Sequence, residues 1–235
     1  MIHDAAGNLY GTTLGGTYGH GTVFRLDTQG NLTSLYNFMG GTDGDTPFGG
    51  LARDAKGNLY GTTLYGGANS CGNYNCGTVF KIDAQGVESI LYSFGGFTKG
   101  DGELPECDVI EDMAGNIYGA TSSSQSAAYL FKINQAGQET NLYNFGGDFP
   151  GRHMVRDSSG NFYGAIGAGG AYNAGGVFKF DSNGVYTLLY SFNGPTDGEG
   201  PWDGVVRDAA GNLYGTTSEG GPWPHLGTVF ELTFP

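Results

Sequence analysis

A five-fold internal repeat constrains the fold of this chain more than any other feature of its sequence. The string Gly-Asn-(Leu/Ile/Phe)-Tyr-Gly recurs at steps of 50, 58, 45 and 51 residues. Its copies are residues 7–11, 57–61, 115–119, 160–164 and 211–215. Strings close to Gly-Thr-Val-Phe and Leu-Tyr-(Asn/Ser)-Phe follow in the same order, although the chain stops before a fifth copy of the second. Such a regular period predicts an array of equal supersecondary units.

Each unit contains four short segments, called a to d here in chain order, and each segment has the length of a β-strand. The Gly-Asn-(Leu/Ile/Phe)-Tyr-Gly string begins segment b. Helices are disfavoured because 46 of 235 residues are Gly, and each interior Gly costs a helix about 1 kcal/mol. The pattern predicts an all-β fold, a five-bladed β-propeller with four-stranded antiparallel blades. We expect one domain over residues 1–235, with repeats near 1–49, 50–106, 107–151, 152–202 and 203–235.

The a–b and c–d connections share the pattern Asp/Asn-x-x-Gly. They begin at Asp4, Asp27, Asp54, Asp83, Asp112, Asn134, Asp157, Asp181 and Asp208. The Asp or Asn side chain caps a tight turn and the Gly takes its left-handed position, so we interpret these acids as structural. Because strands of a blade alternate in direction, these hairpins share one face and the variable b–c and d–a loops share the other. We expect function on the loop face and none on the hairpin face.

Charge and composition exclude several classes of partner. The chain has 23 Asp+Glu and 10 Lys+Arg, a formal net charge of −13. This charge disfavours binding to nucleic acid or to anionic lipid, and no apolar run is long enough to span a membrane. The aromatic residues, 14% of the chain, are sufficient for a folded core. We expect a monomer, either in mature form or as a fragment of a longer protein, because no signal peptide precedes the first repeat.

Aromatic residues in the loops are the main candidates for ligand binding. They are Tyr18, Tyr74, Tyr172 and Trp223 in b–c loops, with Trp202 in a d–a loop. Exposed rings stack well on sugar rings or other flat ligands, but rings can also simply pack over glycine-rich loop bases. His20 and His225 accompany two of these rings, and ring closure would make the first and fifth blades neighbours. Two His are too few for a typical metal site, and we assign no catalytic residue.

Three d–a loops are acidic. They contain Asp43-Gly-Asp45, Asp101-Gly-Glu103 and Asp197-Gly-Glu199, each followed by Pro. The carboxylates could bind Ca²⁺ or act as an acid–base pair. Repetition of Asp-Gly before Pro favours a turn instead. We therefore predict no cofactor, with calcium as the alternative.

The last residue of segment a varies between units. It is His3, Arg53, Glu111, Arg156 or Arg207. Strand a is the innermost strand of a blade, so these residues could form a polar ring that binds an anion. Pairing of the arginines with the neighbouring turn aspartates is the favoured interpretation. Glu111 stands out because no other unit has an acid there.

The three cysteines divide into a pair and a single residue. Cys71 and Cys76 have four residues between them, and no second Cys or His pair completes a zinc site. A disulfide is the better interpretation, and it indicates an oxidising compartment. It would stiffen the loop that carries Tyr74. Cys107 is expected to be a buried thiol.

The complete unit resembles the repeat of the GloVer tandem-repeat proteins, which are bacterial surface or secreted propeller-like arrays. It runs Gly-Leu-x-x-Asp-x-x-Gly-Asn-Leu-Tyr-Gly-Thr-Thr, then Gly-Thr-Val-Phe-Lys-Leu-Asp-x-x-Gly and Leu-Tyr-Ser-Phe. The likeness covers nearly the whole chain, is best in residues 51–94 and 205–230, and is weakest at residues 128–131. It implies a secreted or cell-surface location and supplies no catalytic motif. The architecture also resembles the sugar-binding propellers of the tachylectin type.

These observations support three hypotheses of function. The first is a non-catalytic extracellular propeller that binds a glycan or another small polar ligand through the b–c and d–a loops. The second is a glycoside hydrolase or lyase that uses Asp/Glu and His of the same face. The third is a structural scaffold for protein interactions.

Overall fold

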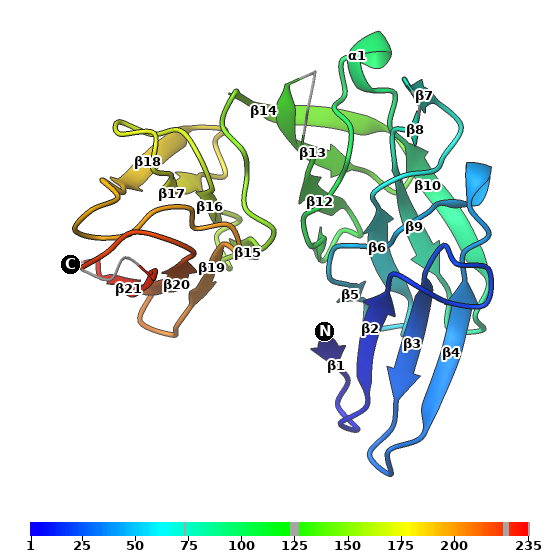
Figure 1. The fold of residues 1–235 in the computed structure, drawn as a ribbon. Helices are drawn as coiled ribbons and strands as arrows, with labels where there is room; N and C mark the ends of the chain where they lie inside the picture. The colour runs from blue at the N-terminus through cyan, green and yellow to red at the C-terminus, as the bar shows by residue number, and fades with distance from the viewer. Residues whose placement is uncertain (73, 123–126, 223–225, 235) are drawn as a thin grey trace. The chain divides into compact units, whose positions relative to one another are not determined.

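The computed structural model describes residues 1–72, 74–122, 127–222 and 226–234. Within these residues the fold is all-β, and helix is confined to the short segments η1 (Gly41–Asp43) and α1 (Gly96–Lys99) (Figure 1). Five antiparallel sheets form the blades, so the predicted propeller class is confirmed. The chain divides into two compact units, residues 1–142 and 143–235. No described helix has the length and apolar character that a membrane crossing requires.

Residues 1–142 contain the first two blades and most of the third. In each sheet the strands follow one another in the order a, b, c, d, as the repeat predicts. Blade 1 contains β1 (Ile2–His3), β2 (Leu9–Thr13), β3 (Thr22–Leu26) and β4 (Leu32–Asn37). Blade 2 contains β5 (Ala52–Arg53), β6 (Leu59–Thr63), β9 (Thr78–Ile82) and β10 (Glu88–Ser93). Blade 3 contains β11 (Ile110–Glu111), β12 (Ile117–Ala120), β13 (Ala128–Ile133) and β14 (Glu139–Gly146).

Residues 143–235 contain the end of β14 and the last two blades. Blade 4 contains β15 (Val155–Arg156), β16 (Phe162–Ile166), β17 (Gly176–Phe180) and β18 (Tyr186–Ser191). Blade 5 contains β19 (Val205–Arg207), β20 (Leu213–Thr217) and β21 (Thr228–Leu232). Its sheet has three strands because the fifth copy of the repeat lacks segment d.

The a–b turns are organised around the aspartate that begins each one. In blade 1, Asp4 Oδ1 accepts hydrogen bonds from the backbone N–H groups of Ala6 and Asn8, at 2.9 and 3.0 Å. Its Oδ2 accepts from Asn8 Nδ2 at 2.9 Å and from the Tyr10 hydroxyl at 3.0 Å. The hydrogen bond from the Asn8 side chain is the main reason that the pKa of Asp4 falls from 3.8 to about 2. These contacts confirm the structural role expected for the turn aspartates.

Phenylalanines of segments c and d build the core between successive blades. Each segment-d Phe meets the segment-c Phe of the next blade edge to face, with ring centroids 5.0 to 5.4 Å apart. The pairs are Phe38–Phe80, Phe94–Phe131, Phe145–Phe178 and Phe192–Phe230. All of these rings except Phe145 and Phe230 are essentially inaccessible to solvent. The repeated Phe therefore serves as the contact that joins one blade to the next.

Candidate functional site

Three of the loop tyrosines are exposed to solvent. The exposed fractions of Tyr18, Tyr74 and Tyr172 are 57%, 61% and 68%. Burial over the loop bases, the alternative considered for these rings, therefore does not describe these three residues. Trp202 differs, because its indole lies directly over Gly167 and faces Phe149 at 6.5 Å. Trp223 and His225 lie outside the described residues.

A histidine–aspartate pair lies on the loops of blade 1. His20 Nδ1 is 3.0 Å from Asp45 Oδ2, and both side chains are partly exposed. The backbone N–H of Thr46 also donates to the His20 carbonyl oxygen at 3.0 Å. The b–c and d–a loops of this blade are thus joined by two contacts, which fix the imidazole at the surface.

The same aspartate connects blade 1 to the aromatic residues of blade 2. Asp45 and Tyr65 exchange two backbone hydrogen bonds, at 2.9 and 3.0 Å. The ring of Tyr65 stacks on Tyr74, with centroids 4.9 Å apart and planes inclined by 29°. We call the five residues Tyr18, His20, Asp45, Tyr65 and Tyr74 the tyrosine–histidine surface. Sequence reasoning missed Tyr65, although its position beside the d–a loop follows from the repeat.

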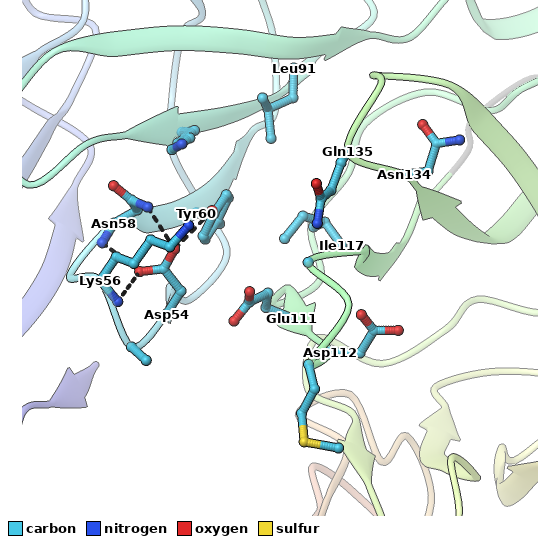
Figure 2. A pocket seen from close by; sticks show the side chains of 14 residues that line it. Asp54, Lys56, Asn58, Tyr60, Leu91, Glu111, Asp112, Ile117, Asn134 and Gln135 are labelled. Atoms are coloured by element: carbon cyan, nitrogen blue, oxygen red, sulfur yellow. Dashed lines mark hydrogen bonds between the residues drawn. The ribbon is translucent and has the colours of Figure 1, made fainter.

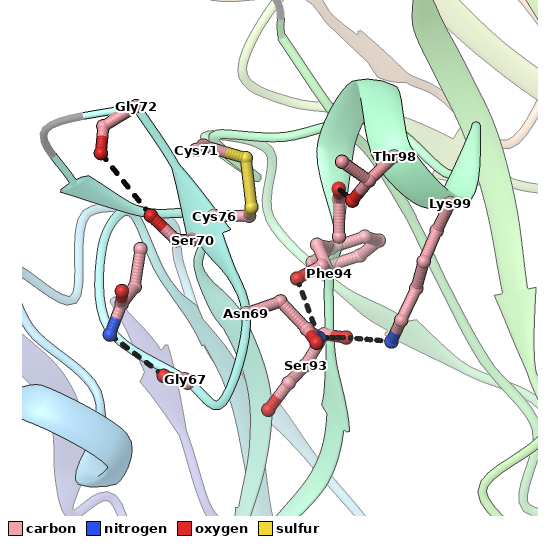
Figure 3. Close-up of a disulfide and its surroundings, with 12 residues drawn as sticks. Gly67, Asn69, Ser70, Cys71, Gly72, Cys76, Ser93, Phe94, Thr98 and Lys99 are labelled. Carbon is pink, nitrogen blue, oxygen red and sulfur yellow. Dashed lines mark hydrogen bonds between the residues drawn. A yellow bond between two sulfur atoms is a disulfide. The ribbon is translucent and has the colours of Figure 1, made fainter.

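The disulfide between Cys71 and Cys76, with Cα atoms 5.2 Å apart, is confirmed (Figure 3). It closes the hairpin of β7 (Ser70–Cys71) and β8 (Tyr74–Asn75), which carries Tyr74. Asn69 ties the base of this loop to the end of β10, because its Nδ2 donates to the carbonyl oxygens of Ser93 and Phe94. The ring of Tyr74 is therefore presented by a constrained loop. Cys107 is buried and takes no part in this disulfide, as expected.

The acidic d–a loops are organised as turns. In each, the first carboxylate accepts a hydrogen bond from a segment-d tyrosine and another from a backbone N–H. Asp43 accepts from Tyr36 and Met39, Asp101 from Tyr92 and Gly95, and Asp197 from Tyr190 and Asn193. The second carboxylates differ in exposure, since Asp45 is partly exposed and Glu103 is buried. Among the described residues no group of three or more His, Cys, Asp or Glu is arranged to hold a metal ion. Calcium binding by Glu199 or the other five carboxylates stays a prediction.

The arginines that end segment a make contacts that were not expected. The guanidinium of Arg53 lies over the Tyr10 ring, and that of Arg207 over the Tyr163 ring, each 5.5 Å from the centroid. The preference for pairing with the turn aspartates is therefore wrong for these two residues. Arg156 lies over Phe162 at the same distance, whereas His3 Nδ1 is 3.2 Å from the Asp4 carbonyl oxygen.

Glu111 lines a pocket on the hairpin side of blades 2 and 3 (Figure 2). The pocket has a volume of about 580 Å³. Its wall includes Asp54 and Tyr60 of blade 2 and Asp112 and Gln135 of blade 3. The hairpin face, on which no function was expected, thus carries a pocket. The signal in the sequence was Glu111 itself, the one acidic residue at its repeat position.

Comparison with known proteins supports the repeat assignment and the fold. The sequence model of the Gloeobacter/Verrucomicrobia repeat family matches residues 1–148 and again residues 64–235. No curated protein matches the sequence.

Solved structures that resemble the chain have a sequence identity of only 12 to 15% to it, so they show the fold alone. The extracellular domain of a protein assigned as a one-component system of B. thetaiotaomicron matches 94% of this chain at a TM-score of 0.57 and 12% identity. A protein of Bacteroides uniformis assigned as a 6-phosphogluconolactonase matches 97% at a TM-score of 0.61 and 15% identity. TolB of Acinetobacter baumannii matches 96% at a TM-score of 0.52 and 15% identity. The chain spans 25%, 64% and 52% of these three proteins, respectively.

Proposed function

The chain belongs to the Gloeobacter/Verrucomicrobia repeat family, and we propose that it is an extracellular, non-catalytic propeller that binds glycan. The binding site is the tyrosine–histidine surface. The observation that carries this proposal is Tyr74, a 61% exposed ring held in place by stacking on Tyr65. An exposed ring gains contact area when a sugar covers it, and prior ordering reduces the entropy that binding removes.

The polar groups beside the rings suit a hydroxylated ligand. Asp45 offers carboxylate oxygens that accept hydrogen bonds from sugar hydroxyls, and His20 Nε2 offers a further polar site. A few fixed polar groups next to an apolar contact are typical of sites for small molecules. Tyr172 of blade 4, with an exposed fraction of 68%, is a candidate for a separate contact with a glycan.

Two observations support an extracellular location. The Cys71–Cys76 disulfide persists in oxidising compartments and is rare in the cytosol. A solved extracellular domain is among the structures that the chain resembles. The hydrolase or lyase hypothesis has no comparable support, and the first carboxylate of each acidic d–a loop accepts a hydrogen bond from a segment-d tyrosine in its turn.

The proposal is tested by applying the protein to an array of bacterial and plant oligosaccharides and measuring the strongest hit by calorimetry. We expect Tyr74→Ala to weaken binding by about tenfold or more, because ring stacking contributes on the order of 1.4 kcal/mol. Leu32→Ala is the control, since Leu32 is 69% exposed and begins β4, beside the c–d hairpin. An array without hits, or a Tyr74→Ala variant with unchanged affinity, would overturn the proposal. Release of reducing ends from a polysaccharide by the wild type, lost in His20→Ala, would replace it with the enzyme hypothesis.

A further inference from the structure

Two junctions between successive blades have the same cation–aromatic contact. At the junction of blades 1 and 2, the Arg53 guanidinium of the later blade covers the Tyr10 ring of the earlier blade. At the junction of blades 4 and 5, Arg207 covers Tyr163 in the same way, also 5.5 Å from the centroid. A guanidinium over an aromatic face is attracted by the negative potential of the ring. This position therefore favours a planar cation.

The junction of blades 2 and 3 lacks that cation. The residue that ends segment a is Glu111, and the tyrosine of the earlier blade is Tyr60. Glu111 is shorter than an arginine and carries the opposite charge. Lys81 does lie 5.9 Å from the Tyr60 ring. However, Lys179 lies at the same distance from Tyr163, which Arg207 also covers, so the lysine does not replace the arginine.

The pocket of about 580 Å³ lies where the arginine is missing. Figure 2 shows Glu111 between the Asp54–Tyr60 side of the pocket and the Ile117–Gln135 side. Gln135 is also specific to blade 3, because the other c–d turns have Thr28, Ala84 or Ser182 at this position. Its Nε2 donates to the Ala114 carbonyl oxygen at 2.6 Å. Its other amide atom, Oε1, is an acceptor for a donor within the pocket.

The carboxylates of the pocket differ in the hydrogen bonds that they accept. Asp54 and Asp112 each accept hydrogen bonds from their own turn. Asp54 also accepts one from the Tyr60 hydroxyl, and Asp112 one from the Tyr118 hydroxyl. The carboxylate of Glu111 makes no hydrogen bond or ion pair with the part of the chain that the structure describes. Partial burial raises the pKa of Glu111, and Asp54 and Asp112 raise it further, whereas Lys56 opposes them. A cation in the pocket would relieve this repulsion.

We infer that this pocket binds an alkylguanidinium group, which takes the place that Arg53 has at the junction of blades 1 and 2 and that Arg207 has at the junction of blades 4 and 5. Glu111 accepts a charge-assisted hydrogen bond from the guanidinium, and the Tyr60 ring supports its face. Leu91 and Ile117 line the same pocket and suit the alkyl part of the ligand. The site is separate from the tyrosine–histidine surface and does not depend on the function proposed there. The group could belong to a free metabolite or to an arginine side chain of a peptide.

The test is calorimetry on the whole chain with agmatine, L-arginine, a Gly-Arg-Gly peptide, citrulline and butylamine. We expect saturable one-to-one binding of the guanidinium compounds and none of citrulline, which lacks the charge. Preference for agmatine or for the peptide identifies the source of the group. Tighter binding of butylamine than of agmatine, or no saturable binding of any guanidinium compound at millimolar concentration, would overturn the inference.

Two substitutions at one position make the test specific. Glu111→Gln keeps the shape and removes the charge, so we expect affinity for agmatine to fall at least tenfold. Glu111→Arg introduces the residue found in three other blades. Its guanidinium should cover the Tyr60 ring and so abolish binding of the ligand. Because that residue already suits the fold, a normal melting temperature is expected for this variant. Glu219→Gln, outside the pocket, and Tyr74→Ala should bind agmatine like the wild type, and unchanged binding by Glu111→Arg would contradict the assignment.

Discussion

Gly61 lies directly opposite Phe80 in the register of β6 and β9, and the Phe80 ring fills the space that a side chain on Gly61 would need. A Cβ added to Gly61 would lie 2.5 Å from Phe80 Cζ. The same Gly–Phe pair recurs in every blade. The pairs are Gly11–Phe24, Gly61–Phe80, Gly119–Phe131, Gly164–Phe178 and Gly215–Phe230. The central Gly of the repeat is therefore required by the aromatic core.

Replacing this glycine should destabilise the fold. We expect Gly61→Ala to lower the free energy of unfolding by about 1–3 kcal/mol, because overpacking a filled core displaces side chains. Gly15→Ala is the matched control, since no atom lies within 4 Å of a Cβ at that position and its φ is not in the left-handed region. Urea denaturation of both variants measures the difference. Equal midpoints for the two would contradict the role assigned to the Gly–Phe pair.

The turn aspartates should contribute unequally to stability. Asp157 accepts four hydrogen bonds in its a–b turn, two of them from the side chains of Asn161 and Tyr163. Asp181 accepts two in its c–d turn, both from backbone N–H groups. At about 1 kcal/mol for each hydrogen bond, Asp157→Ala should cost on the order of 2–4 kcal/mol and Asp181→Ala about half as much. Thermal unfolding followed by circular dichroism checks the order, and a larger loss in Asp181→Ala would refute it.

Stability should fall as the pH rises toward neutrality. Burial raises the pKa of Glu88 and of Glu139 to about 7, with added repulsion from Asp43 and Asp101, respectively. One carboxyl oxygen of each is buried without a hydrogen-bond partner. The folded state thus holds protons that the unfolded state, with a pKa of 4.5, has released. The melting temperature should decrease between about pH 4.5 and pH 7.

A double variant isolates this effect. Glu88→Gln with Glu139→Gln should flatten the decrease, because an amide does not titrate. At lower pH the turn aspartates act in the opposite direction, since stability from the lowered pKa of Asp4 is lost as the pH falls from 3.8 toward 2. A slope that persists in the double variant would show that other groups cause it.

The disulfide should affect both stability and the binding surface. Opening the bond between Cys71 and Cys76 frees a short loop, for which chain entropy predicts a loss of about 2 kcal/mol. We expect the Cys71→Ser, Cys76→Ser double variant to melt at a lower temperature and to bind glycan less tightly, because Tyr74 is no longer held. In Cys107→Ser the disulfide remains, so reduction with dithiothreitol should lower its melting temperature as it does in the wild type. Insensitivity of the wild type to reduction would contradict the prediction.

Local features of the fold could be predicted from the sequence, whereas contacts between units could not. The Asp-x-x-Gly turns and the Cys71–Cys76 bond involve residues close in sequence, so composition and spacing were sufficient to predict them. The contact of Arg53 with Tyr10 joins residues from different repeats, and local reasoning preferred the adjacent Asp54. The stack of Tyr65 on Tyr74 depends on the path of an irregular loop, which periodicity does not describe. The pocket beside Glu111 required both the register of two sheets and the missing arginine.

The contact between Arg207 and Tyr163 has a consequence for how an array of this kind diversifies. The last residue of segment a occupies the same position in each copy of the repeat. Replacing an arginine there, as with Glu111 in blade 3, uncovers the tyrosine ring of the preceding blade. The contacts of Arg53 with Tyr10 and of Arg207 with Tyr163 are unaffected by the exchange at Glu111. In a tandem array, the last residue of segment a can therefore change in one repeat, and create a binding site there, while the other repeats stay as they are. Arg53→Glu and Arg207→Glu would each remove the guanidinium that covers a tyrosine ring, Tyr10 and Tyr163 respectively.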